Sequence, residues 1–259
     1  MRRALVGGAL AVAVAAAAVV FLAWPRGASE VSTEDAVADF RARAADADGS
    51  GYEDESLPEA GVYTYDLAGD ESAKLGPLPA EDRSLPDTAT VVVVSDGDGC
   101  ATLTLNLIEQ HTEDTRWCRD GEALVLDAHT KHLELGALSP TASLTCDPDV
   151  LVDPDVEQTS LACTLVLDGG PASVEAEVTG TASRGAPTRT EVDGEAVEAI
   201  PLELRYELSG DLSGTWSEVL LLDAATALPL EVTRDLDLSG LATFREHSEL
   251  ALRSLAPAG

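Results

Sequence analysis

The sequence is short of basic residues. Lys and Arg together number 16, against 47 Asp and Glu in 259 residues, and Lys74 and Lys131 are its two lysines. The net charge of −31 leaves few cations for phosphate contacts, so the composition excludes a nucleic-acid partner and a basic patch for anionic lipid. Aromatic residues amount to 4%, which is little material for the stacking platforms of sugar-cleaving enzymes. The 45% hydrophobic content is ordinary, so we expect a packed core.

The motifs of common catalytic and nucleotide-binding sites are also missing. The sequence contains no G-x-S-x-G, no H-E-x-x-H, no G-x-x-x-x-G-K-[ST] and no G-x-G-x-x-G after a strand-like run. Carboxylates are so abundant that a pair of them does not by itself indicate a glycosidase. We therefore expect a protein that is not an enzyme, with no catalytic residue and no cofactor.

Four cysteines are present, and no two of them show the two-residue gap of a zinc knuckle or a thioredoxin site. Three pairings are open in principle. The separations of 18 and 17 residues favour two local bridges between neighbouring strands, a pattern typical of exported proteins. The expected bridges join Cys100 to Cys118 and Cys146 to Cys163.

The N-terminus predicts the location of the protein. Arg2 and Arg3 precede an uninterrupted apolar run over residues 4–24, which is long enough to cross a bilayer. The positive residues place the extreme N-terminus in the cytoplasm and the rest of the chain outside. The alternative is a cleaved secretory signal cut near residues 27–29, although such signals usually have a shorter apolar region of about 7–15 residues. We expect an uncleaved anchor in the cell membrane with a single pass.

A short helix is predicted just after this anchor. Ser32 can cap it, and Asp35 completes a box-like start signal. Val37, Phe40 and Ala44 recur at helical spacing and form a weak apolar stripe. The expected organisation is a signal anchor over 1–26, an acidic juxtamembrane linker with this helix over 27–60, and an extracytoplasmic antiparallel β domain over 61–259.

Part of the linker resembles a calcium-binding loop. Oxygen-bearing residues fall at loop positions 1, 3, 5 and 9, and Gly51 stands at position 6. However, position 12 is Leu57 in place of the bidentate Glu, and Pro58 blocks the exit helix. A flexible acidic linker is therefore favoured over a metal site at Asp46, Asp48, Ser50 and Asp54.

The histidines do not predict a metal site. His129 and His132 lie three residues apart in a stretch that reads as a strand, where such residues face opposite sides. His111 and His247 are isolated in the sequence, so surface or packing roles are expected for them.

From Gly61 onward the hydrophobic period changes from 3.6 to 2, which predicts strands. Apolar and polar residues alternate over 101–107, 174–178 and 202–208, with turn signals between the runs. Asp and Glu fall mostly in turns and at outward positions, as on the wet face of a sheet. The continuous run Val91–Val94 predicts a central strand covered on both faces. The expected fold class is mainly β with an N-terminal helix: a large curved antiparallel sheet or half-barrel of about ten to twelve strands, after one transmembrane helix.

Most of residues 61–257 resembles a group of actinobacterial membrane-anchored envelope proteins. The resemblance is carried by Gly61-Val-Tyr63-Thr-Tyr65, Gly99-Cys100, Trp117-Cys118, Cys146 and the Leu208–Leu255 pattern. It implies a location in the cell envelope and no particular activity.

A shorter stretch is similar to LolA, LppX and RseB-like envelope proteins. A strand ending in Asp223, a turn with Thr226, and Leu228-Pro229 opening the next strand recur in that group. This likeness implies a curved antiparallel half-barrel whose concave face holds a helix or lipid chains. The chain differs from the lipoprotein members because it lacks a lipidation cysteine after the apolar run, and its few aromatics offer little cavity lining.

The leading functional expectation is a non-catalytic binding or interaction domain of the cell envelope that presents an acidic face to a cationic protein. The alternative is a carrier of a lipid or another apolar ligand in a half-barrel cavity. A third interpretation is that the negative charge serves solubility alone. The residues expected to line such a cavity are Leu103, Leu105, Leu204, Tyr206 and Leu230.

Overall fold

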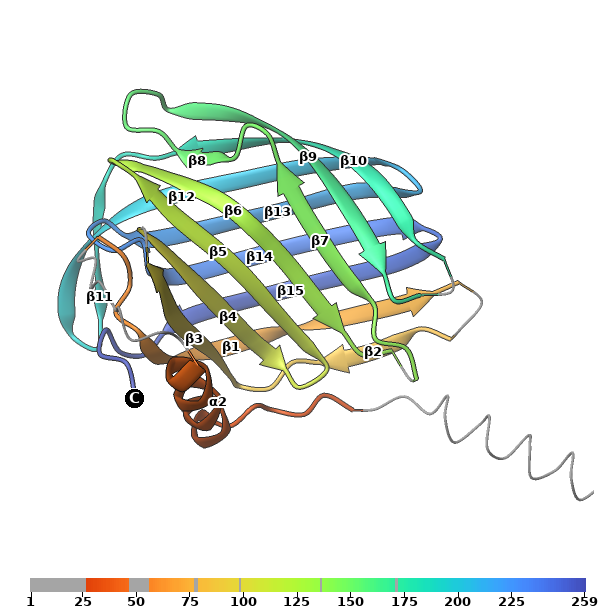
Figure 1. The fold of residues 1–259 in the computed structure, drawn as a ribbon, viewed down its shortest axis with the longest axis horizontal. Helices are drawn as coiled ribbons and strands as arrows, with labels where there is room; N and C mark the ends of the chain where they lie inside the picture. Colours follow the sequence, from red (N-terminus) through yellow and green to blue (C-terminus); the bar gives the residue numbers. More distant parts are fainter. Residues whose placement is uncertain (1–26, 47–55, 77–78, 98, 136, 171) are drawn as a thin grey trace, which may run out of the picture.

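The computed structural model describes residues 27–46, 56–76, 79–97, 99–135, 137–170 and 172–259 (Figure 1). Within these ranges no helix is long and apolar enough to cross a membrane. The predicted anchor at residues 4–24 lies outside them. The fold is mainly β and antiparallel, as the sequence predicts.

Fifteen strands and one helix follow one another in the described residues. They are α2 (Thr33–Asp46), β1 (Gly61–Leu75), β2 (Glu81–Ser84), β3 (Thr88–Gly97), β4 (Cys100–Ile108), β5 (His111–Asp120), β6 (Ala123–Leu133), β7 (Thr141–Cys146), β8 (Val150–Val152), β9 (Gln158–Asp168), β10 (Val174–Arg184), β11 (Thr188–Val192), β12 (Glu195–Gly210), β13 (Leu212–Asp223), β14 (Pro229–Gly240) and β15 (Ala242–Leu252).

The sheet closes on itself into a barrel and does not remain an open half-barrel. Twelve strands of the described chain form a ring in the order β10-β9-β7-β6-β5-β4-β3-β1-β15-β14-β13-β12, and β12 pairs with β10 to complete it. The long strand β12 makes this closure, because one half of it pairs with β10 and the other half with β11. Closure satisfies backbone groups that an open sheet would leave unpaired at its edges.

The barrel has two ends. The β4–β5, β9–β10, β12–β13 and β14–β15 connections lie at one of them, which we call the β4–β5 end. The β3–β4, β5–β6 and β13–β14 connections lie at the other, the β13–β14 end, together with the C-terminus (Figure 1).

Alternation along the strands separates a packed lumen from a wet exterior. In β14 the side chains of Val232, Leu236 and Leu238 are buried, while Asp235 and Asp237 between them are exposed. Successive strand residues point to opposite faces, so this period places the apolar set inside the closed wall. The predicted alternation is therefore confirmed.

The helix α2 covers the outside of the wall at β1 and β3 (Figure 1). Ser32 Oγ accepts a hydrogen bond from the backbone N–H of Asp35 at 3.1 Å, so the predicted cap is present. Ala36 of the helix packs with Val62 and Val92 on the outer face, and Phe40 joins them. The neighbouring residues of β3 point into the barrel core. The predicted strand covered on both faces is confirmed.

Two disulfides link neighbouring strands. Cys100 is bonded to Cys118 across β4 and β5, and Cys146 to Cys163 across β7 and β9. These are the two local bridges that the spacing favours. All four cysteines of the chain are used.

The position of α2 leads to a first prediction. Ala36→Asp places a carboxylate in the buried contact with Val92, so the helix should detach while the barrel, whose core lies on the other side of the wall, stays folded. We expect the free energy of local opening of α2 to fall by about 2 kcal/mol. Hydrogen exchange of residues 33–46 measures it. The matched control is Ala38→Asp on the exposed face of the same helix, and equal effects of the two substitutions would contradict the packing.

Candidate functional site

The most unusual feature of the lumen is a set of nine buried ionisable side chains, the lumen cluster. Their residues are at most 7% exposed. The five buried glutamates are exceptions to the expectation that Asp and Glu lie mostly in turns and at outward positions. The expected surface or packing role of an isolated His111 is corrected, because His111 belongs to this cluster. The members are Glu71, Glu81, Arg83, His111, Glu113, Lys131, Glu218, Arg234 and Glu246.

Strand register places opposite charges beside each other in the lumen cluster. In antiparallel pairs the side chains of directly opposite residues lie close together. Three such pairs join an acid to a base: Glu71 with Arg83 across β1 and β2, Glu113 with Lys131 across β5 and β6, and Glu218 with Arg234 across β13 and β14.

Glu113 is the centre of the cluster and connects opposite walls. Its Oε1 lies 2.7 Å from Arg234 Nη1 on β14 and 2.9 Å from His111 Nε2 on its own strand, and it also accepts from Lys131 Nζ. The strands β5 and β14 are not neighbours in the ring, so the contact with Arg234 crosses the lumen. One carboxylate thus holds three cationic groups.

Glu246 lies beside another carboxylate and contacts two of the cations that also contact Glu113. It lies directly opposite Glu71 in the β1–β15 pair, an arrangement that repels when it is uncompensated. Lys131 Nζ lies 3.4 Å from Glu246 Oε2, and Arg234 Nη1 lies 3.3 Å from Oε1. Ser248 donates a further hydrogen bond to Oε1 at 2.7 Å.

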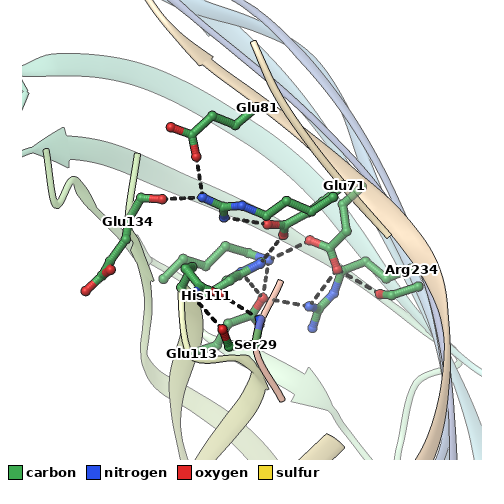
Figure 2. Close-up of polar contacts among 12 residues, drawn as sticks. Ser29, Glu71, Glu81, His111, Glu113, Glu134 and Arg234 are labelled. Carbon is green, nitrogen blue, oxygen red and sulfur yellow. Dashed lines mark hydrogen bonds and ion pairs between the residues drawn. The ribbon is translucent and has the colours of Figure 1, made fainter. Parts of the chain in front are cut away.

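A second group of contacts extends the cluster to Glu81 and Arg83 of β2 (Figure 2). Arg83 reaches Glu71 Oε1 at 2.8 Å and Glu81 Oε2 at 2.6 Å, and it also donates to the backbone carbonyl of Glu134. His111 Nδ1 lies 2.7 Å from Glu71 Oε2. His111 therefore bridges Glu71 and Glu113 and joins the two groups into one network.

Burial and pairing set the ionisation of the cluster. Burial favours neutral His111, but its contacts with Glu113 and Glu71 outweigh this and raise its pKa to about 9. Burial likewise opposes ionisation of Glu246, yet Lys131 and Arg234 lower its pKa to about 2. The same two cations hold the pKa of Glu113 well below its usual value despite burial. With His111 protonated, five carboxylates face four cations, so the formal charge of the cluster is −5 + 4 = −1.

Two small cavities lie beside the cluster in the described lumen. A cavity of about 80 Å³ lies on one side, bordered by Glu113, Glu218 and Arg234, and a cavity of about 60 Å³ lies on the other, bordered by Lys131. Trp216 borders both, and its Nε1 donates to Glu218 Oε1 at 3.0 Å. Sites for ordinary ligands measure about 300–1,000 Å³. The described lumen is therefore filled mainly by side chains.

The residues expected to line a cavity lie around the larger of these spaces. Leu103, Leu105, Leu204 and Tyr206 border it, while Leu230 is packed in the core and does not. Burial raises the pKa of Tyr206, so its hydroxyl is neutral. These residues thus converge on one place, which has room for a few waters or a very small molecule.

The histidine pair behaves as a strand requires. His129 is 6% exposed and faces the lumen, whereas His132 is on the outside. Burial lowers the pKa of His129 to about 4, and its Nδ1 lies 2.9 Å from Thr115 Oγ1. Its Nε2 has no hydrogen-bond partner among the described residues. His247 is exposed and pairs with Asp235 at 2.8 Å.

Spacing alone would suit a metal ion at His111, Glu113 and Glu246, whose ligand atoms lie within 4.8 Å of one another. However, Lys131 and Arg234 already contact both carboxylates, and His111 is protonated at neutral pH. The protein itself supplies the positive charge that a metal would bring. The calcium-loop residues Asp48, Ser50 and Asp54 lie outside the described residues, and Asp46 ends α2.

A signal for the cluster was present in the sequence. Glu113 is in phase with Trp117, Arg234 with Leu236, and Glu246 with Leu250, so each charged residue occupies an apolar phase of its strand. A charge at an inward position is costly unless it is paired. The phase therefore indicates buried charges, but the partners across the lumen are far apart in sequence and only the fold reveals them.

Comparisons with known proteins add little to this geometry. No protein-family model matches the chain, and no curated protein matches it significantly. A crystal structure of the hypothetical lipoprotein YmcC from Escherichia coli K12 aligns with 87% of this chain and 100% of its own, at 12% identity and a TM-score of 0.40. The resemblances to the actinobacterial group and to LolA, LppX and RseB-like proteins stay predictions.

The position of Glu113 leads to a second prediction. Glu113→Gln removes the carboxylate that holds three cationic groups, so it should lower the free energy of unfolding by about 3–5 kcal/mol. Urea unfolding with the disulfides intact measures the change. Glu177→Gln, the same substitution at an exposed position of β10, should stay within about 0.5 kcal/mol. A small loss at Glu113 would contradict the inference that its carboxylate compensates the buried cations around it.

The shifted pKa values of the two buried histidines, His111 and His129, predict that the free energy of unfolding is greatest near pH 6.5. The pKa of His111 is raised to about 9, so its contribution is complete below pH 6.5 and is lost as the pH rises from 6.5 to 9. The pKa of His129 is lowered to about 4, so stability is lost as the pH falls from 6.5 toward 4. Each arm should have a slope of up to about 1.4 kcal/mol per pH unit.

Unfolding free energies measured from pH 4 to 10 test this profile. His111→Gln should flatten the alkaline arm, and His129→Gln should remove its share of the acid arm. His132→Gln, on the outer side of the same strand as His129, should leave both arms in place. An unchanged alkaline arm in His111→Gln would contradict the assignment.

Proposed function

We propose that this chain is a non-catalytic, membrane-anchored, extracytoplasmic interaction domain of the cell envelope, and that its outer wall binds a cationic partner. Residues 4–24 anchor it, and the barrel is the part that binds. The proposal rests mainly on an unpaired acidic strip on the exterior of the closed barrel.

The lumen supports a role on the outside. Its acidic and basic groups form ion pairs with one another, and the cavities beside them measure only about 80 and 60 Å³. A substrate of ordinary size has no room to reach these groups. A carrier of lipid or another apolar ligand, the alternative function, needs a space several times larger than these two cavities. A hollow of about 670 Å³ lies at the β13–β14 end, but four acidic residues border it: Glu59, Glu195, Glu198 and Asp223.

The acidic strip lies where the barrel closes. Glu175 and Glu177 of β10 and Glu207 of β12 are exposed on adjacent strands, and they make no ion pair within the described chain. We call these three residues the acidic seam. The nearest arginine along β12, Arg205, is occupied by Glu203 through a 2.9 Å hydrogen bond. The described chain thus leaves the negative charge of the acidic seam uncompensated. Such a charge attracts a cationic surface.

Binding of a fluorescent ten-lysine peptide to the full chain in nanodiscs of zwitterionic lipid tests this proposal. We expect binding that weakens about tenfold when NaCl rises from roughly 0.05 M to 0.5 M, because salt screens exposed charges. Glu175→Gln, Glu177→Gln and Glu207→Gln together should abolish most of it.

The matched control neutralises three exposed glutamates of the β11–β12 hairpin, Glu191, Glu195 and Glu198, and should keep the binding. Equal losses in the two triple variants would show that the peptide senses only the overall charge. That result would favour the interpretation that the acidic composition serves solubility.

A further inference from the structure

The N-terminal strap, residues 27–32, is fixed to one end of the barrel. Ser29 is held on both sides: its carbonyl accepts from the backbone N–H of Glu109 at 2.8 Å, and its own N–H donates to Gln110 Oε1 at 3.1 Å. Gln110 is 6% exposed, and its Nε2 reaches Ser29 Oγ at 3.4 Å. Glu30 also bonds to Thr88, the first residue of β3. All these contacts lie at the β4–β5 end.

The length of chain before the strap limits where this end can be. Ser29 follows Trp24, the last residue of the apolar run, by five residues. A fully extended connection of that length spans at most about 17 Å. The barrel is longer than this, because the 12 residues of β14 cover roughly 40 Å of strand, or roughly 30 Å along the axis at the usual tilt.

We propose that the β4–β5 end faces the bilayer surface and that the β13–β14 end points away from it. This inference rests on the proposed anchor at residues 4–24. If the β13–β14 end faced the membrane, Ser29 would lie roughly 30 Å from the surface, which exceeds the reach of the connection. The strap therefore excludes that orientation as long as its contacts with Glu109 and Gln110 hold.

The β4–β5 end faces the lipid surface itself, and the short connection between the anchor and the strap holds it there. The exposed side chains around it include Asp82, Glu109, Asp168 and Asp211, with Lys74 as a nearby cation. Such a surface is repelled by anionic headgroups, so proximity must come from the chain connection and not from electrostatic docking.

Energy transfer from the barrel to the membrane tests the orientation. The full chain is placed in nanodiscs of phosphatidylcholine that contain a headgroup-labelled acceptor, with a donor at Leu241→Cys or at Ala225→Cys. Leu241 is 56% exposed between β14 and β15 at the β4–β5 end, and Ala225 is exposed in the β13–β14 turn. Transfer from the label at 241 should be at least about twofold more efficient than from the label at 225, given the length of the strands between them.

Two variants test whether the contacts of the strap cause the orientation of the barrel. Gln110→Ala removes the side chain that holds Ser29 and should reduce the difference between the two labels, whereas Glu109→Gln leaves the backbone hydrogen bond and should preserve it. An undiminished difference in Gln110→Ala would overturn the strap as the cause of the orientation.

The intact mass of the purified chain tests the anchor, and the ratio of energy transfer from the two labels tests the orientation. Loss of the residues before Ser29 from the purified chain would overturn both the anchor and the orientation. An intact chain with equal transfer from both labels, or with more from 225, would overturn the orientation and leave the anchor standing.

Discussion

A buried charge costs several kcal/mol unless a partner lies within contact distance, and this constraint shapes the whole interior. Glu113 on β5 contacts Arg234 on β14, and Lys131 on β6 contacts Glu246 on β15. These partners belong to opposite walls of the ring. A wider lumen would break these two contacts and leave each charge only its partners on its own or a neighbouring strand.

The same requirement explains why the lumen is not a binding chamber. Long charged side chains reach from both walls into the middle, and Trp216 fills the space beside them. The cavities that remain on either side are lined by apolar side chains together with charged members of the cluster. A buried ionic network can specify one arrangement of a core without adding net stability. In this barrel its contacts across the lumen join β5 to β14 and β6 to β15.

Most of the fold could be predicted from the sequence, since period-two alternation, turn residues and a capping signal are local. The helix at Ser32, the twice-covered run at Val91 and the two disulfides follow from such signals. Closure of the sheet could not be predicted, because it depends on the long-range pairing of β12 with β10. The lumen cluster was missed for a related reason. A charged residue in an apolar phase is visible in the sequence, but its partner is more than 100 residues away for Glu113 and Arg234.

The two proposals together restrict the partner. Glu175 and Glu177 are among the first four residues of β10, and Glu207 is among the last four of β12, so the acidic seam lies near the β4–β5 end. In the proposed orientation the strap, bound to Glu109 and Gln110, holds that end near the bilayer. A cationic surface that docks on the seam would then lie close to the membrane as well. A partner with basic residues beside its own membrane segment satisfies both conditions, whereas one confined far from the bilayer would meet the other end of the barrel.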